Sequence, residues 1–190
     1  MSGCRQLSDE EYTKTKEKLQ HSLRNKCIFI LGYRAGFRIS ELLSIKIKDV
    51  WQCNEVTDSI KVQKRNIKGK SQSREVVLHK EAKLIIKEYI LSLRSIDLES
   101  PLFKSRQGIN KPLDRRMAWR LLRDAFKAAH VTGSVATHSM RKSFAFKIYK
   151  KLGNDMYKTK NALGHSSVLT TEKYIPIDFD EISLAIKSMD

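Results

Sequence analysis

The chain has 190 residues, and its 37 lysines and arginines outnumber 21 aspartates and glutamates to give a formal net charge of +16. No run of about 18 apolar residues is present, which excludes a transmembrane helix, and the polar N-terminus lacks an apolar signal region. We therefore expect a cytoplasmic protein. Three widely spaced cysteines, Cys4, Cys27 and Cys53, predict neither a disulfide framework nor a metal site.

The excess of positive charge favours a polyanionic partner. A membrane surface is the competing interpretation, but the charge is spread along the chain and does not gather in one basic amphipathic helix. Nucleic acid is therefore the favoured partner before any motif is considered. The length predicts a single domain over residues 1–190, and the apolar residues of segment 178–190 predict a helical tail.

The N-terminal part of the chain predicts helices. Ser8 and Glu11 have the spacing of a capping box, which predicts a helix start. A second helix is expected over residues 23–34. Gly36 can adopt a positive φ angle and predicts a turn, after which a short helix is expected over 39–44.

The middle of the chain predicts a β-hairpin over residues 59–79, because Ile60-Lys-Val62 alternates on one side of a basic loop at 66–73 and the apolar Val76-Val-Leu78 lies on the other. An amphipathic helix is expected over 81–94 and a stronger one over 113–130. The apolar stripe of the stronger helix contains Met117, Leu121, Leu122, Ala125, Phe126 and Ala129.

Three further helices are expected toward the C-terminus. The first begins near His138, and the second is capped by Asn154 or Asp155 and closed by Gly164. The third is amphipathic and covers residues 181–189. The expected fold class is mainly α with a small antiparallel β-sheet, that is α+β.

Five residues have the chemistry to cleave a phosphodiester: Arg38, His138, Arg141, His165 and Tyr174. The arginines suit the phosphate oxygens because a guanidinium donates a fork of N–H groups and keeps its charge. A tyrosine phenol needs cationic surroundings to act as a nucleophile, since its free pKa is about 10. Each residue alone has an ordinary structural explanation, such as a surface arginine or a core aromatic. Their order and spacing favour a shared site.

These residues stand in recognisable motifs. The motifs are Gly36-Phe-Arg38-Ile-Ser-Glu41-Leu, His138-Ser-Met-Arg141, Leu163-Gly-His165, and Tyr174 nine positions after that histidine. Together they resemble the catalytic domain of the tyrosine recombinases, the phage-integrase family. The resemblance covers residues 7–176 and implies the catalytic-domain fold of that family.

The resemblance implies a role for each motif residue. Tyr174 would attack the phosphate and form a 3′-phosphotyrosyl link to DNA, and Arg38 and Arg141 would hold the phosphate oxygens. His138 would act as general acid or base, and His165 would hydrogen-bond the scissile phosphate. Such a reaction needs no metal, no ATP and no other cofactor.

The family also places a lysine of the β-hairpin as general acid for the leaving oxygen. Lys70 fits that position, and Lys68 and Lys64 remain alternatives because hairpin loops vary in length. Glu41 matches the acidic position that braces Arg38 in the family.

The resemblance implies double-stranded DNA as the partner, bound by basic side chains outside the catalytic set, and therefore association with the nucleoid in a prokaryotic host. Most family members carry an additional N-terminal helical domain that completes a clamp around DNA, and we expect this chain to lack it. The chain therefore resembles either the short members of the family or a catalytic domain separated from its clamp. The candidate DNA-binding residues are Lys68, Lys111, Arg115, Arg116 and Arg120.

Recombination uses four active sites on two duplexes, so a homotetramer is expected on recombining DNA. The segment 178–190 has apolar residues that suit docking on a neighbouring protomer, as the family's C-terminal helix does. Packing of this helix on its own domain is an equally good interpretation.

The function implied is that of a site-specific recombinase, which integrates, excises, inverts or resolves DNA. A type IB topoisomerase uses a similar set of residues, but the Leu163-Gly-His165 turn and the position of Tyr174 favour the recombinase. A non-catalytic DNA-binding regulator is the alternative from another class. The presence of all five candidate residues argues against it.

Overall fold

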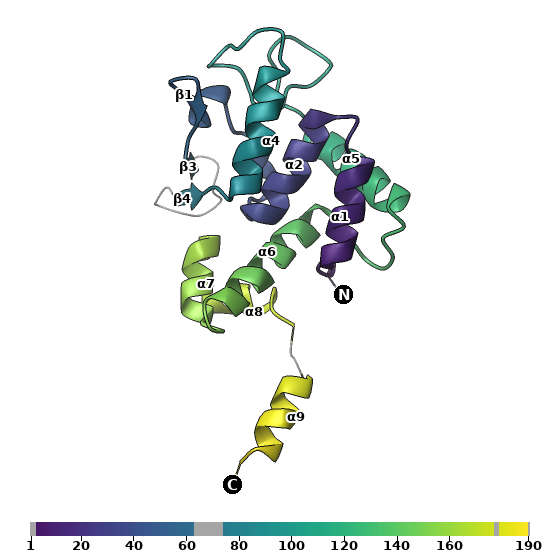
Figure 1. Cartoon of the computed structure of the whole chain (residues 1–190), viewed down its shortest axis with the longest axis vertical. Helices are drawn as coiled ribbons and strands as arrows, with labels where there is room; N and C mark the ends of the chain where they lie inside the picture. Colours follow the sequence, from purple (N-terminus) through teal and green to yellow (C-terminus); the bar gives the residue numbers. More distant parts are fainter. Residues whose placement is uncertain (1–2, 63–73, 177–178, 190) are drawn as a thin grey trace. The chain divides into compact units, whose positions relative to one another are not determined.

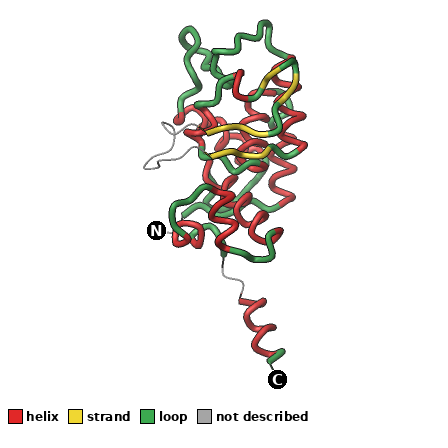
Figure 2. Tube along the Cα trace, turned by 90° about the vertical axis from the view of Figure 1, so that its left-hand side faces the viewer, coloured by secondary structure: helices red, strands yellow, loops and turns green. Residues whose placement is uncertain are grey.

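The computed structural model describes residues 3–62, 74–176 and 179–189. These residues are mainly helical, with two small antiparallel strand pairs that are yellow in Figure 2. The predicted fold class is confirmed, although the strands form two pairs and not one sheet. The elements, which can be followed in Figure 1, are in chain order α1 (Asp9–Lys18), α2 (Leu23–Arg34), α3 (Ile39–Leu43), the 3-10 helix η1 (Ile47–Asp49), β1 (Trp51–Gln52), β2 (Glu55–Val56), β3 (Ser59–Val62), β4 (Arg74–Val77), α4 (Lys80–Leu91), α5 (Arg115–Ala128), α6 (Thr137–Lys151), α7 (Met156–Leu163), α8 (Val168–Glu172) and α9 (Phe179–Lys187).

The chain divides into two compact units, which we call unit 1 (residues 1–144) and unit 2 (residues 145–190). The boundary falls inside helix α6. The single domain over residues 1–190 stays a prediction, because compact units of this kind can belong to one domain.

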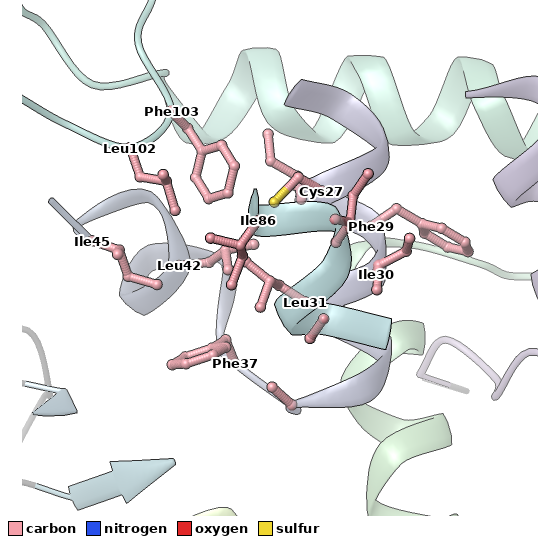
Figure 3. Packing of buried hydrophobic residues seen from close by; sticks show 14 of the residues in the cluster. Cys27, Phe29, Ile30, Leu31, Phe37, Leu42, Ile45, Ile86, Leu102 and Phe103 are labelled. Atoms are coloured by element: carbon pink, nitrogen blue, oxygen red, sulfur yellow. The ribbon is translucent and has the colours of Figure 1, made fainter. Parts of the chain in front are cut away.

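Unit 1 is built around helix α2, in which every residue from Cys27 to Tyr33 is buried. A helix that is buried on all sides belongs in the centre of a core. Figure 3 shows Leu31 of α2, Leu42 of α3 and Ile86 of α4 in one cluster of buried side chains. The short helix α3, which follows the Gly36 turn, is thereby anchored to the core by its apolar face.

The capping box at the start of α1 is present as the sequence predicts. Ser8 Oγ accepts a hydrogen bond from the Glu11 backbone N–H at 3.1 Å, and Glu11 Oε2 accepts one from the Ser8 N–H at 2.9 Å. These two bonds satisfy N–H groups that have no partner inside the helix. The cap therefore fixes where α1 begins.

The segment before this cap, residues 5–7, forms what we call the N-terminal strap. The Arg5 backbone N–H donates to the Ser134 carbonyl at 2.8 Å, and the Leu7 N–H donates to Ser143 Oγ at 2.8 Å. The Arg5 guanidinium also pairs with Glu11 and donates through Nε to the Thr132 carbonyl at 3.1 Å. The strap therefore ties the start of the chain to the loop before α6 and to α6 itself.

The hairpin strands β3 and β4 pair antiparallel, with Ile60 opposite Val76. Both of these side chains are buried, whereas Val77 beside them is exposed, as expected when successive side chains point to opposite faces. The connecting loop with Lys64, Lys68 and Lys70 lies outside the described residues.

The second strand pair, β1 with β2, is not predicted by the sequence. Its two-residue turn consists of Cys53 and Asn54, which have φ angles of 51° and 60°. Two positive φ angles are typical of a type I′ hairpin turn, which usually contains glycine. The turn escapes prediction because Cys-Asn is a weak signal for it.

Helix α5 buries a face that differs slightly from the predicted stripe. Ala118, Leu122 and Phe126 are buried, but Met117 is 43% exposed. Successive residues of a helix are turned by about 100°, so Met117 faces away when Ala118 faces the core. Met117, which the sequence places in the apolar stripe, therefore lies at the exposed edge of that stripe.

Unit 2 contains the C-terminal part of α6 and the helices α7, α8 and α9. Asp155 caps α7 by accepting a hydrogen bond from the Lys158 N–H at 2.8 Å, and Gly164 closes it with a φ of 62°. The five-residue helix α8 packs against α7 and is not predicted by the sequence. Among all the described residues, no helix has both the length and the apolar character needed to cross a membrane.

Candidate active site

The turn at Gly36 positions two arginines of unit 1. Gly36 has a φ of +63°, and a Cβ atom there would lie 2.2 Å from Phe144 Cδ1, so the turn requires glycine. Its carbonyl accepts a hydrogen bond from Arg141 Nη1. Two residues later, Arg38 is the N-cap of α3. The turn therefore places Arg141 beside the segment that carries Arg38, although the two are far apart in sequence.

The buried carboxylate of Glu41 holds Arg38 in place. Glu41 Oε1 accepts a hydrogen bond from Arg38 Nη1 at 2.6 Å, and Oε2 accepts one from the Arg38 backbone N–H at 2.9 Å. Oε2 also accepts a hydrogen bond from Arg74 Nη2 at 2.9 Å. The Glu41 side chain is 0% exposed, whereas the Arg38 side chain is 32% exposed. Arg38 therefore keeps part of its guanidinium accessible while its direction is fixed.

The charges of this cluster do not cancel. Burial alone would raise the pKa of Glu41, but the charge of Arg74 and the hydrogen bonds from Arg38 outweigh it, so the pKa lies below its ordinary value of 4.5. Burial lowers the pKa of Arg74, yet an arginine remains charged at neutral pH. Two guanidinium groups thus surround one carboxylate, which leaves a surplus of positive charge for an anion.

Helix α6 adds two more candidate residues, His138 and Arg141, one turn apart. Arg141 is fully buried. Desolvation lowers the pKa of His138 to about 4, and the positive charges of Arg141, Lys142 and Arg38 act in the same direction. His138 keeps an exposed surface, so its desolvation reflects crowding around the ring and not complete burial. At neutral pH, His138 is therefore a neutral imidazole with one donor and one acceptor nitrogen.

Unit 2 brings His165 and Tyr174 together. His165 directly follows the Gly164 turn, and its Nδ1 lies 2.9 Å from Thr171 Oγ1 of α8. The ring centroids of His165 and Tyr174 are 5.0 Å apart, with an angle of 57° between the planes. Both side chains are buried. The short helix α8 thus orients the histidine and places the tyrosine beside it.

Four of the five candidate DNA-binding residues lie on the surface of unit 1. They belong to the N-terminal half of α5 and the loop before it. Lys68 and the proposed general acid Lys70, with its alternative Lys64, lie outside the described residues. The exposed candidates are Lys111, Arg115, Arg116 and Arg120.

Arg74 is a member of the Glu41 cluster that the sequence does not identify. It lies at the start of β4, and its side chain is 12% exposed. Its Cζ atom lies over the Phe37 ring, 5.8 Å from the ring centroid. Its charge, more than any other, holds down the pKa of Glu41. The one signal available is its position directly after the basic hairpin loop.

The described part of the chain contains no group of three or more His, Cys, Asp or Glu side chains that could hold a metal ion.

Comparison with known proteins places these clusters in context. The model of the phage integrase family matches residues 6–181. This chain belongs to the phage integrase family. Among its curated relatives, the probable integrase/recombinase YoeC of Bacillus subtilis (strain 168) is 31% identical over 169 residues, which covers 89% of this chain and 86% of YoeC. The family predicted from the motifs is therefore confirmed.

Other relatives of this phage integrase family member are longer. The tyrosine recombinase XerD of Corynebacterium glutamicum is 32% identical over 164 residues, and the match covers 84% of this chain but 50% of XerD. The chain therefore spans about half the length of that relative.

Solved structures of the family share its fold. The crystal structure of XerA recombinase matches 99% of this chain and 67% of its own, with a TM-score of 0.79 and 24% identity. A lambda integrase dimer bound to a COC' core site matches 90% of this chain and 48% of its own, with a TM-score of 0.68 and 19% identity. At these identities the likeness concerns the fold alone.

Proposed function

We propose that this chain breaks and rejoins DNA as a site-specific tyrosine recombinase, through a covalent 3′-phosphotyrosyl intermediate. Membership of the phage integrase family supports this function. The observation that carries it is the arrangement around Glu41, where two arginines share one buried carboxylate with Arg141 and His138 beside them. Such an arrangement concentrates positive charge around a partly exposed guanidinium, which suits a phosphate.

The first step is binding of the scissile phosphate. Arg38 and Arg141 donate hydrogen bonds to its two non-bridging oxygens, whose charge increases as the phosphorus becomes five-coordinate. Glu41 keeps Arg38 oriented before DNA arrives, so little side-chain ordering remains for the moment of reaction. His165, oriented by Thr171, donates a further hydrogen bond to the phosphate.

The second step is transfer of the strand to the enzyme. The Tyr174 oxygen attacks phosphorus, a bond forms between them, and the bond from phosphorus to the 5′ oxygen breaks. The phenol loses its proton, and His138 suits the role of acceptor because its imidazole is neutral at neutral pH. The leaving 5′ oxygen gains a proton, which we assign to Lys70. Reversal of these transfers with a new 5′ hydroxyl rejoins the DNA, so the bond energy is kept and no cofactor is consumed.

Double-stranded DNA is the proposed substrate, in agreement with the net charge of +16. Among the structural neighbours, XerH is described bound to its difH substrate and lambda integrase bound to a core site as a dimer. We extend this to a homo-oligomer, a tetramer on recombining DNA, held through segment 178–190. In α9 of that segment, Ile182, Leu184 and Ile186 are exposed and available to a neighbouring protomer.

A suicide substrate tests the proposal. Duplexes selected from a random pool for binding to the chain are nicked beside the candidate cleavage position, so that the short leaving strand diffuses away and a covalent adduct accumulates. The wild-type chain and Tyr157→Phe should form the adduct, whereas Tyr174→Phe should not. Tyr157 is a matched control because it lies in the same unit and is 63% exposed.

The alternatives give different results. Adduct formation and supercoil relaxation without exchange between two sites would indicate a topoisomerase. Specific binding without an adduct on any selected duplex would contradict the proposal and indicate a regulator.

A further inference from the structure

A pocket of about 340 Å³ lies in unit 1, beside the N-terminal half of α5. Four arginines from three parts of the chain line it: Arg24 from α2, Arg106 from the loop before α5, and Arg116 and Arg120 from α5 itself. A volume of this size is in the range of small-ligand sites, which begin at about 300 Å³. Four positive charges around one such space attract an anion, and three of the arginines, Arg106, Arg116 and Arg120, are exposed and open to a ligand.

The positive charge of the pocket is not neutralised by the carboxylate within it. Asp114 lines the pocket, but it is the N-cap of α5 and accepts a hydrogen bond from the Arg116 backbone N–H at 3.0 Å. Arg24 is fixed by donating to the Lys104 carbonyl at 2.8 Å. Burial lowers the pKa of Arg24, and the positive charge of Arg106 lowers it further. The lining therefore carries four guanidinium groups and one carboxylate, which leaves three positive charges in excess.

The rest of the lining consists of two polar residues, Ser105 and Gln107, and three apolar ones. Leu113, Met117 and Leu121 lie between the arginines. Met117 is 43% exposed, so its side chain is accessible to a ligand in the pocket. A ligand that fits this lining has an anionic group for the arginines and an apolar face for the three side chains.

We infer that this pocket binds one nucleotide unit, with its phosphate on Arg24 and Arg106 and its deoxyribose against Leu113, Met117 and Leu121, while the base stays paired in the duplex. Arginines suit such a ligand because a guanidinium binds phosphate through two N–H groups. The nucleotide belongs to the DNA strand that α5 contacts, so this inference rests on the proposed function. Arg24 and Arg106 then extend the DNA contact from α5 to α2 and to the loop before α5.

Duplex binding in a salt series tests the phosphate part. Arg106→Ala should weaken binding roughly fivefold at 100 mM salt and reduce the magnitude of the slope of log K against log salt by about 0.9, the value for one phosphate contact. Lys87→Ala is the control, because Lys87 is an exposed cation of α4 that does not line the pocket. It should leave the slope unchanged. Equal slopes for the two variants would overturn the inference.

Filling and labelling the pocket tests the apolar part. Met117→Trp keeps every charge but occupies the space, so it should weaken binding without changing the slope. A photoreactive benzoylphenylalanine at position 117 should crosslink to nucleotides at one position of the duplex. The same group at Leu84, an exposed residue of α4 outside the pocket, should not. Crosslinking from position 117 to protein and not to DNA would overturn the inference in favour of an acidic protein partner.

Competition separates the two possible sources of the nucleotide. If the nucleotide belongs to DNA, millimolar dTMP, dAMP or inorganic phosphate should not prevent the crosslink to the duplex. Prevention of the crosslink by a free nucleotide, but not by phosphate, would support the chemistry of the pocket and assign it to free nucleotides. The Tyr174 adduct is measured in parallel. If the adduct forms without the position 117 crosslink, the inference about the pocket is wrong and the proposed function stands. If the crosslink forms without the adduct, the proposed recombinase function is wrong and the inference about the pocket stands.

Discussion

The buried carboxylate of Glu41 offers the sharpest test of the site's construction. Glu41→Gln keeps the size of the side chain but removes the charge shared by Arg38 and Arg74. Removing one partner of a buried ion pair costs about 3–5 kcal/mol of unfolding free energy. Arg74 is 12% exposed and falls in this range, whereas Arg38 is 32% exposed and regains some hydration. The glutamine oxygen still accepts one hydrogen bond, so we expect the lower end, about 3 kcal/mol.

Urea unfolding measures this loss, since domains of this size have about 5–15 kcal/mol of stability and a 3 kcal/mol change is well resolved. Glu99→Gln is the matched control. Glu99 also accepts hydrogen bonds from two cations, Lys46 and Lys48, at 2.8 and 2.6 Å, but its side chain is 64% exposed. Water and salt screen such a pair, so its loss should change stability little. Equal stability losses in the two variants would refute the reasoning that burial makes the Glu41 cluster strong.

The pH dependence provides an independent check on Glu41. Its pKa in the folded chain is lowered below the ordinary value of 4.5. The unfolded chain therefore binds this proton more readily, and the stabilisation is complete above about pH 4.5 and is lost as the pH falls toward the lowered pKa. The wild type should lose stability over this range, and Glu41→Gln should lose less.

Two further predictions concern the turn and the histidine. Gly36→Ala should reduce the unfolding free energy by more than about 1 kcal/mol, since the added Cβ meets Phe144 at 2.2 Å in addition to the strain of a positive φ. Gly153→Ala is the control, because Gly153 also has a positive φ, +68°, but open space around its Cβ position, so this variant measures the backbone strain alone. An equal loss of unfolding free energy in the two variants would contradict the steric argument. His138 has its pKa lowered from 6.5 to about 4, so the unfolded chain takes up its proton first and stability should fall as the pH drops from 6.5 to 4. In chemical unfolding, His138→Gln should lose less unfolding free energy than the wild type between pH 6.5 and pH 4. Equal losses in the two chains would contradict the lowered pKa of His138.

Local signals in the sequence predict much of the fold. The Ser8 capping box and the Gly164 helix end are predicted because each motif acts on backbone atoms a few residues away. The five-residue helix α8 and the Cys53–Asn54 turn escape prediction because short elements carry weak patterns. Met117 lies at the exposed edge of its stripe because one residue turns a helix by about 100°, so a stripe read from sequence has a blurred edge.

In the candidate site too, residues that lie close together in sequence are predicted and contacts between distant residues are not. Arg38 and Glu41 are found from sequence because they stand three residues apart in one motif. The contribution of Arg74 is not, because it lies 33 positions from Glu41 and only folding brings the two side chains together. The catalytic roles assigned to Arg38, His138, Arg141, His165 and Tyr174 remain predictions that the suicide substrate tests.

The N-terminal strap has a consequence for the order in which unit 1 folds. The Leu7 N–H and its acceptor Ser143 Oγ are separated by 136 positions, and Arg5 and Thr132 by 127. Closing so long a loop is slow compared with forming a helix, because the chain must first search many conformations. During synthesis, Arg5 and Leu7 cannot meet these partners until residues 132–143 have been translated. We therefore expect the strap to be among the last contacts to form, and to attach to the helix that carries His138 and Arg141 at the end of folding.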